Sequence, residues 1–200
     1  MRRTILAALA MLSAFQMHVA CAADPTELDE KLRKDAAETP GTGQVFMEVQ
    51  VNDKGPLHRT CEGFIVKVVS EAGNSKAFMT QHAGTWFGRE LESSTYGGAA
   101  VLPAGSYTVV YVECIASPVR WNGRFARFNL RAGEVVNLGL LVIDYVKPLL
   151  SLTFTSRTSV GDLTPKAVAS LKKRAPVAFA KTTRRYMTPN PAMSNPLPPQ

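Results

Sequence analysis

The sequence predicts an all-β protein, an antiparallel β-sandwich with a C-terminal helical extension. Between residues 44 and 156, short runs rich in Val, Ile, Phe, Tyr and Thr alternate with breaks that carry Gly, Pro and Asn. Strands at a spacing of roughly ten residues are typical of sandwiches and barrels, not of parallel sheets with crossover helices. The chain has 200 residues, of which 46% are hydrophobic, and this composition suits one domain with a core of ordinary size.

The N-terminus has the pattern of a secretory signal peptide. Two arginines precede an apolar run over residues 4–15, which is too short to span a bilayer because a membrane helix needs about 20 residues. The cleavage pattern ends at Ala22, so we expect residues 1–22 to be removed and the mature chain to be periplasmic or secreted. The alternative, a lipoprotein acylated at Cys21, is disfavoured by His18, which stands where such signals usually have Leu or a similar residue.

The mature chain begins with a polar lead-in over residues 23–41, which a Pro-Gly pair closes, and we expect a short helix or a mobile segment there. The sandwich domain is predicted over 42–158. Its strands are expected at 44–51, 64–70, 76–81, 98–102, 106–114, 124–130, 135–146 and 149–156. Asp144 and Lys147 interrupt the apolar stretch over the last two, and charges in mid-bilayer are expensive. We therefore expect two buried strands there and no transmembrane span.

Strand alternation predicts which side chains share a face of the sheet. One face of the strand over 106–114 is expected to carry Thr108, Val110, Val112 and Cys114. One face of the strand over 124–130 is expected to carry Ala126, Phe128 and Leu130, with Arg127, Asn129 and Arg131 pointing the opposite way.

Two cysteines remain once Cys21 is removed with the signal peptide, namely Cys61 and Cys114. In an oxidising compartment a pair of this kind predicts one disulfide. Closing the loop between them would stabilise the fold by about 4 kcal/mol in the chain-entropy model. The alternative, a redox-active pair of thiols, has no C-x-x-C motif to support it.

The segments over 99–113 and 126–143 resemble a known family. The first reads "AAVLPAGSYTVVYVE" and the second "ARFNLRAGEVVNLGLLVI". They are similar to the strand and hairpin of carboxypeptidase-regulatory-like and prealbumin-like (transthyretin-like) β-sandwich modules, as in small exported bacterial envelope proteins. The resemblance implies a prealbumin-like or Ig-like sandwich that serves as an accessory, binding or scaffold module. It brings no catalytic motif to carry over, and the cysteine pair and the basic C-terminus depart from the generic module.

The chain after the sandwich is predicted to be a basic helical extension over 159–187. Thr164 is expected to cap a helix that begins at Pro165, because a threonine hydroxyl accepts a free N–H of the first turn and proline fits the first helical position. A second helical segment is expected after Pro176. Residues 188–200 contain five prolines and are predicted to be extended or disordered.

Charge is unevenly distributed along the mature chain. Residues 23–163 hold 14 basic and 16 acidic residues, whereas residues 164–200 hold seven basic residues and no acidic one. We expect this extension to dock on an envelope protein or an anionic membrane surface, through Lys172, Lys173, Arg174, Lys181, Arg184 and Arg185. The alternative is that the extension folds back onto the acidic lead-in. Nucleic acid is not an expected partner, since the chain leaves the cytoplasm and has no nucleic-acid-binding motif.

The remaining candidate sites are weak. Trp86 lies between two glycines and Trp121 precedes Asn122-Gly123, a strong hairpin signal, so both would present aromatic faces near loop tips to a glycan or peptide. A row of arginines would recognise anionic groups: Arg120, Arg124, Arg127 and Arg131. We find no pattern for catalytic residues, a cofactor or a metal. The sequence thus favours an exported, non-enzymatic binding or scaffold module of the bacterial cell envelope. The alternative is an envelope enzyme or enzyme inhibitor whose site is assembled from loops.

Overall fold

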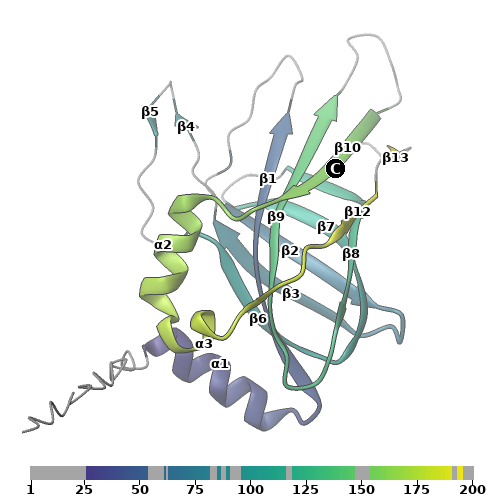
Figure 1. The fold of residues 1–200 in the computed structure, drawn as a ribbon. Coiled ribbons are helices and arrows are strands. Elements are labelled where there is room, and N and C mark those ends of the chain that lie inside the picture. The colour runs from purple at the N-terminus through teal and green to yellow at the C-terminus, as the bar shows by residue number, and fades with distance from the viewer. Residues whose placement is uncertain are drawn as a thin grey trace, which may run out of the picture.

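The computed structural model describes residues 26–53, 61, 63–81, 85–86, 89–90, 96–115, 119–146, 154–190 and 193–195. The predicted fold class is confirmed, since two sheets built mostly of antiparallel strands face each other (Figure 1). The signal peptide and the acylation alternative at Cys21 lie outside the described residues.

The first sheet has the strand order β13-β10-β9-β1-β6, and β11 pairs with β9 beside this path. Its strands are β1 (Thr42–Asp53), β6 (Gly98–Pro103), β9 (Val135–Val146), β10 (Phe154–Gly161), β11 (Thr183–Arg184) and β13 (Met193–Asn195). The central pair, β1 and β9, is parallel, while β6, β10 and β13 are antiparallel to their neighbours. A parallel pair needs a long crossover, and here most of the second sheet lies within the connection.

The second sheet is antiparallel throughout and has the order β12-β8-β7-β2-β3. Its strands are β2 (Gly63–Ser70), β3 (Ser75–Gln81), β7 (Gly105–Cys114), β8 (Arg120–Leu130) and β12 (Thr188–Pro189). A bridge between Gln81 and Gly97 joins the two sheets along one side. The short strands β4 (Thr85–Trp86) and β5 (Arg89–Glu90) pair only with each other among the described residues.

The main core lies between the sheets and is built from alternate residues of the central strands. In β8 the predicted alternation is confirmed: Ala126, Phe128 and Leu130 are buried in this core, and Arg127, Asn129 and Arg131 are exposed. Phe128 stacks on Tyr107 of β7 with ring centroids 5.3 Å apart. The outward face of β8 is therefore a row of polar side chains on the open face of the second sheet.

The predicted face of β7 is wrong in its first half. Val112 and Cys114 are buried as expected, but Tyr107 and Val109 are buried in place of Thr108 and Val110. The cause is a bulge in the pairing of β7 with β2, where Val68 is paired with Val109 but its neighbour Lys67 is paired with Tyr111. A bulge adds one residue on one strand and reverses the alternation beyond it.

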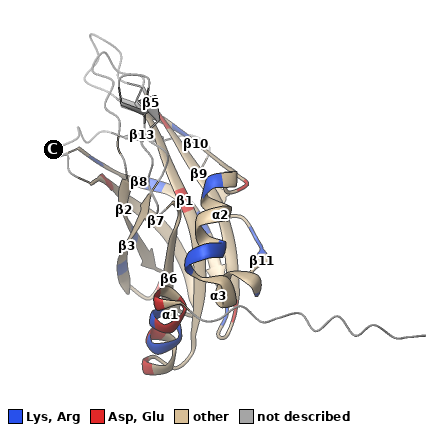
Figure 2. Cartoon of the chain, turned by 90° about the vertical axis from the view of Figure 1, so that its left-hand side faces the viewer, with Lys and Arg blue, Asp and Glu red and all other residues tan. Residues whose placement is uncertain are grey.

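A layer of helices covers the outer face of the first sheet. Figure 2 shows α1 (Glu27–Glu38), α2 (Pro165–Arg174) and α3 (Pro176–Ala180) against this sheet, on the side away from the second sheet. A second core forms between helices and sheet, in which Leu32, Phe46, Leu171 and Phe179 are buried. The rings of Phe46 and Phe179 meet edge to face with centroids 5.2 Å apart. The helical extension is thus a third layer of one domain.

Two buried carboxylates hold the starts of α2 and α3. Glu48 of β1, fully buried, accepts hydrogen bonds from the N–H and the hydroxyl of Thr164, each at 3.0 Å. Thr164 in turn accepts the N–H of Ala167, which confirms it as the predicted N-cap. Asp29 of α1 accepts the N–H groups of Val177 at 3.1 Å and Ala178 at 2.8 Å. Negative groups favour helix N-termini because the helix dipole is positive there.

Replacing Asp29 tests this arrangement. Asp29→Ala is expected to lower the free energy of unfolding by about 1–3 kcal/mol, because it leaves two N–H groups at the start of α3 without their acceptor. Urea denaturation would measure the loss. The matched control is Glu30→Ala, since Glu30 is exposed in the same helical turn and is expected to change stability by at most about 1 kcal/mol. Equal losses in the two variants would contradict the capping role.

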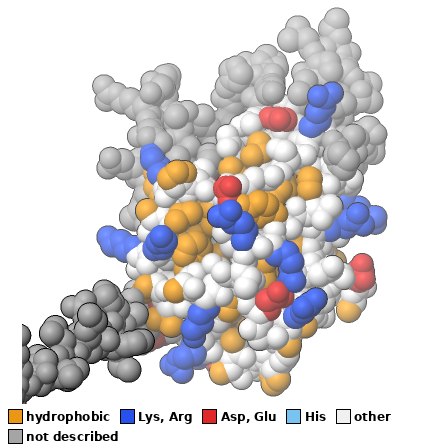
Figure 3. Space-filling view, viewed as in Figure 1, with side chains coloured by type: hydrophobic (Ala, Val, Ile, Leu, Met, Phe, Trp, Pro, Cys, Tyr) orange, Lys and Arg blue, Asp and Glu red, His pale blue; other side chains and the backbone are white. Residues whose placement is uncertain are grey.

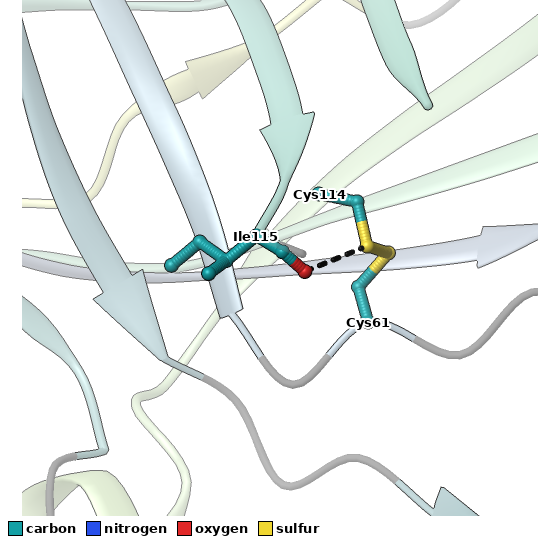
Figure 4. Close-up of a disulfide and its surroundings, with 3 residues drawn as sticks. All are labelled: Cys61, Cys114 and Ile115. Carbon is teal, nitrogen blue, oxygen red and sulfur yellow. Dashed lines mark hydrogen bonds between the residues drawn. A yellow bond between two sulfur atoms is a disulfide. The ribbon is translucent and has the colours of Figure 1, made fainter. Parts of the chain in front are cut away.

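The predicted disulfide is confirmed. Cys61 and Cys114 are bonded, with Cα atoms 5.4 Å apart and a sequence separation of 53. Figure 4 shows the bond beside Ile115, whose carbonyl oxygen lies 3.6 Å from Cys114 Sγ. Cys114 ends β7 and is paired with Phe64 near the start of β2. The bond therefore fastens the segment before β2 to the end of the neighbouring strand.

Of the two alternatives for the C-terminal tail, extended or disordered, the described residues 188–189 and 193–195 take the extended one and form the strands β12 and β13. Thr188 pairs with Arg127 on the edge of the second sheet, and Met193 pairs with Ser156 on the edge of the first. Prolines are tolerated on edge strands, and the free edges of β8 and β10 offer backbone partners to the segment. The helical extension also differs, since residues 159–161 complete β10 and residues 183–184 form β11.

Candidate docking surface

The structure divides the six basic residues predicted to bind a partner into two groups. Three of them, called here the α2–α3 lysines, are exposed at the end of α2 and just after α3: Lys172, Lys173 and Lys181. They form no ion pair with any residue that the structure describes. Basic residues on α2 are visible in Figure 2. These lysines are the part of the predicted set that remains available to a partner.

Arg174 has a structural role instead. It is half-buried, and its Nη1 lies 3.4 Å from the carbonyl oxygens of Tyr96 and of Gly97. Burial lowers the pKa of its guanidinium. The side chain therefore holds α2 to the start of β6.

Arg184 and Arg185 are engaged by acids of the sandwich. Arg184 Nη2 lies 3.3 Å from Asp162 Oδ1, and Arg185 Nη2 lies 2.6 Å from Glu134 Oε2 and 2.7 Å from the carbonyl oxygen of Asn129. Burial acts to raise the pKa of Glu134, but hydrogen bonds from the Arg131 N–H and the Arg185 guanidinium outweigh it, and the pKa is lowered. The pair fastens the segment after α3 to the sandwich.

The alternative, that the extension folds back onto the acidic lead-in, is right for the packing of the helices but not for the pairing of their charges. The lead-in forms α1, which packs on α2 and α3 through Asp29, Leu32 and a hydrogen bond from the Thr26 hydroxyl to the carbonyl of Arg174. The ion pair near the end of α1 joins two residues of that same helix, Lys34 and Glu38, whose Nζ and Oε1 atoms are 3.8 Å apart. The acidic helix is thus docked on the basic one without neutralising the α2–α3 lysines.

Half-exposed apolar side chains lie on the same outer face of the first sheet. Gly139 adopts a φ of +83° at an irregularity of β9, and beyond it Leu141 and Ile143 are buried while Leu140 and Val142 face outward, half-exposed. Their neighbours on β10 are small, Gly161 and Ser159. Figure 3 shows hydrophobic side chains gathered in the middle of this face, with Lys and Arg around them. We call Leu140 and Val142 the β9 patch.

The predicted aromatic ligand site is wrong for Trp121. Its side chain is 4% exposed and lies in the main core, with its ring centroid 6.3 Å from that of Phe64 and 6.4 Å from that of Tyr145. Asn122 and Gly123 form no turn, because β8 runs through them from Arg120, so Trp121 points inward from a strand. The side chain of Trp86, in β4, lies outside the described residues.

The arginine row is not one surface, but part of it joins the C-terminal segment. Arg127 and Arg131 line a cleft of about 590 Å³ together with Arg185. We call it the arginine cleft. It lies on the second sheet, so the helical layer and the cleft are on opposite sides of the sandwich. Neither the spacing of the arginines nor the composition of the segments that carry them revealed that residues of β8 and of the C-terminal segment line one cleft.

The described residues contain no group of three or more His, Cys, Asp or Glu side chains placed to hold a metal ion. Within the same residues, no helix has the length and apolar character needed to cross a membrane. Comparisons of the chain with protein-family models, with curated proteins and with solved structures found no match.

Proposed function

We propose that the protein is an exported, non-enzymatic module of the cell envelope that docks on an acidic envelope protein through the α2–α3 lysines and the β9 patch. The observation that carries the proposal is the exposure of Lys172, Lys173 and Lys181 on helices that are themselves fixed to the sandwich. Export is supported by the N-terminal signal pattern and by the disulfide, which belongs to oxidising compartments.

A protein partner is favoured over a membrane by the mixture of side chains. Protein interfaces combine an apolar centre with a polar rim, and here half-exposed Leu140 and Val142 lie on the same face as the lysines. Because α2 has ten residues, it is about 15 Å long. The lysines at its end and the β9 patch near its start therefore fit within one interface of standard size, about 800 Å² per partner.

Cross-linking tests the docking. A photo-reactive residue at Ala169, exposed on α2, would be introduced into the full chain expressed with its leader. We expect one adduct with an envelope protein, and a loss of at least tenfold in its yield when Lys172, Lys173 and Lys181 are all changed to Glu. The matched control reverses three exposed charges of α1, Lys31, Arg33 and Lys34, and is expected to keep the adduct.

The other outcomes contradict the proposal. An adduct that survives reversal of the α2–α3 lysines would show that docking does not depend on them. If no protein adduct forms and the purified chain floats with vesicles of phosphatidylglycerol but not of phosphatidylcholine, the partner is an anionic membrane and the protein partner is wrong.

A further inference from the structure

The arginine cleft is built on an open sheet face by two elements far apart in the sequence. Its floor is formed by β7 and β8, where Ser106 is paired with Asn129 and Thr108 with Arg127. Its wall is the C-terminal segment, because Thr188 pairs with Arg127 on the other side. A volume of about 590 Å³ is in the range of small-ligand clefts.

Two of the arginines lie in β8 and directly after its end. Arg127 and Arg131 point to the same side of the strand and are four residues apart, which places their Cα atoms about 13 Å from each other. Arg185 stands between them, since its guanidinium bonds the carbonyl oxygen of Asn129. Glu134 engages Arg185, so Arg127 and Arg131, both exposed, carry most of the capacity to bind an anion.

The remaining side chains of the cleft indicate what lies between the anionic groups. Hydroxyl and amide groups predominate, from Ser106, Thr108, Asn129 and Thr188, and Glu71 is the acid in the described lining. The nearby rings of Tyr107 and Phe128 are buried in the core, 3% and 6% exposed. Tyr186 also lines the cleft, but its ring lies over Gly139 of β9 and its hydroxyl bonds Asp162. Guanidinium groups bind carboxylates and phosphates, while hydroxyl and amide groups exchange hydrogen bonds with sugar hydroxyls.

We propose that the arginine cleft binds an acidic oligosaccharide, with its carboxylate or phosphate groups on Arg127 and Arg131 and its hydroxyls on the polar groups between them. A single-stranded nucleic acid would call for exposed stacking rings, and an extended peptide for apolar side-chain pockets or a free sheet edge. The described lining consists mostly of hydroxyl, amide and guanidinium groups instead. The site is separate from the docking surface and does not depend on it.

Calorimetric titration of the purified mature chain tests the proposal. The probes are trigalacturonate, neutral maltotriose, glucose 6-phosphate, inorganic phosphate and a hexaglutamate peptide. Trigalacturonate is expected to bind at least tenfold more tightly than maltotriose, inorganic phosphate or the peptide. Glucose 6-phosphate separates the two anion chemistries. If this shorter sugar binds more tightly than trigalacturonate, the cleft is assigned to phosphate-bearing sugars. If it binds more weakly than trigalacturonate, the cleft is assigned to carboxylate-bearing sugars.

Variants locate the binding. Arg127→Ser with Arg131→Ser is expected to weaken trigalacturonate binding at least tenfold, with thermal unfolding unchanged because both side chains are exposed. The matched control, Lys67→Ser with Lys76→Ser, removes the same charge from exposed positions of the same sheet outside the cleft and should bind as the native chain does. Equal weakening in both variants, equal binding of the peptide, or no binding of either acidic sugar at millimolar concentration would overturn the proposal.

Discussion

A chain that ends at Asp162 is expected not to fold, although it keeps every long strand of the sandwich. It loses the whole of α2 and α3. With them it loses Leu171 and Phe179 of the second core, between helices and sheet, and it also loses Met187 of the main core. Burial of one large apolar side chain contributes about 1.5–3 kcal/mol, and the truncation also exposes Phe46 and takes the Thr164 donors from the buried carboxylate of Glu48. The combined loss approaches or exceeds the whole stability of a typical domain, about 5–15 kcal/mol.

The measurement is near-ultraviolet circular dichroism together with urea unfolding. The truncated chain is expected to show no fixed aromatic signal and no cooperative transition. A chain that ends at Asn190 is the control, because it loses β13 but keeps the helices and β12, and it should unfold cooperatively at a lower urea midpoint. A cooperative transition in the shorter chain would show that the helical layer is an appendage after all.

Removing the disulfide is expected to lower the free energy of unfolding by about 4 kcal/mol. In the chain-entropy model this value follows from the 53 residues that separate Cys61 and Cys114. Both cysteines pack in the main core, so alanine at the two positions keeps most of their apolar contacts. Urea denaturation of Cys61→Ala with Cys114→Ala would measure the loss against the native chain.

Two further measurements test whether the loss comes from the disulfide itself. The native chain treated with reductant should lose about as much stability as the double variant, whereas reductant should leave the variant unchanged. A loss below about 1 kcal/mol in the variant would show that pairing in β2 and β7 already fixes these segments and that the bond adds little constraint.

The sequence predicted those features that depend on local chemistry or a strict period. The alternation in β8 succeeded because apolar residues follow one another at every second position, and the Thr164 cap succeeded because hydroxyl and N–H groups meet within one turn. The cysteine pair was found by elimination, since two thiols in an oxidising compartment have few alternatives.

Features that depend on distant partners were not predicted. Asn122 and Gly123 carry a turn signal, yet β8 continues through them because Tyr111 and Val112 of β7 pair with this segment. No characteristic residue marks the bulge in β7 in the sequence. Residues 188–189 lack the pattern of a strand and become one because β8 has a free edge. In each case tertiary pairing overrides the local preference.

The same limit applies to the candidate sites. Six basic residues have the same charge in the sequence, but Arg174 faces backbone carbonyls and Arg184 and Arg185 face acids. Among the described residues, the three lysines alone are left without such a partner. Asp29 and Glu48 read as ordinary acids of a polar helix and a strand, whereas the fold uses them at helix starts. Charge patterning can find an extension of this kind but not its available residues.

The position of β1 at the centre of the first sheet governs when the protein can fold during synthesis. β1 is the first of the described strands to leave the ribosome, yet its neighbours β6 and β9 begin only at Gly98 and Val135, and the last described strand of this sheet ends at Asn195. Pairing between segments so distant makes folding slow and leaves apolar strands exposed in the meantime. The first sheet is therefore completed only after its C-terminal strands have been synthesised, and this delay would keep the nascent chain open for the export proposed above.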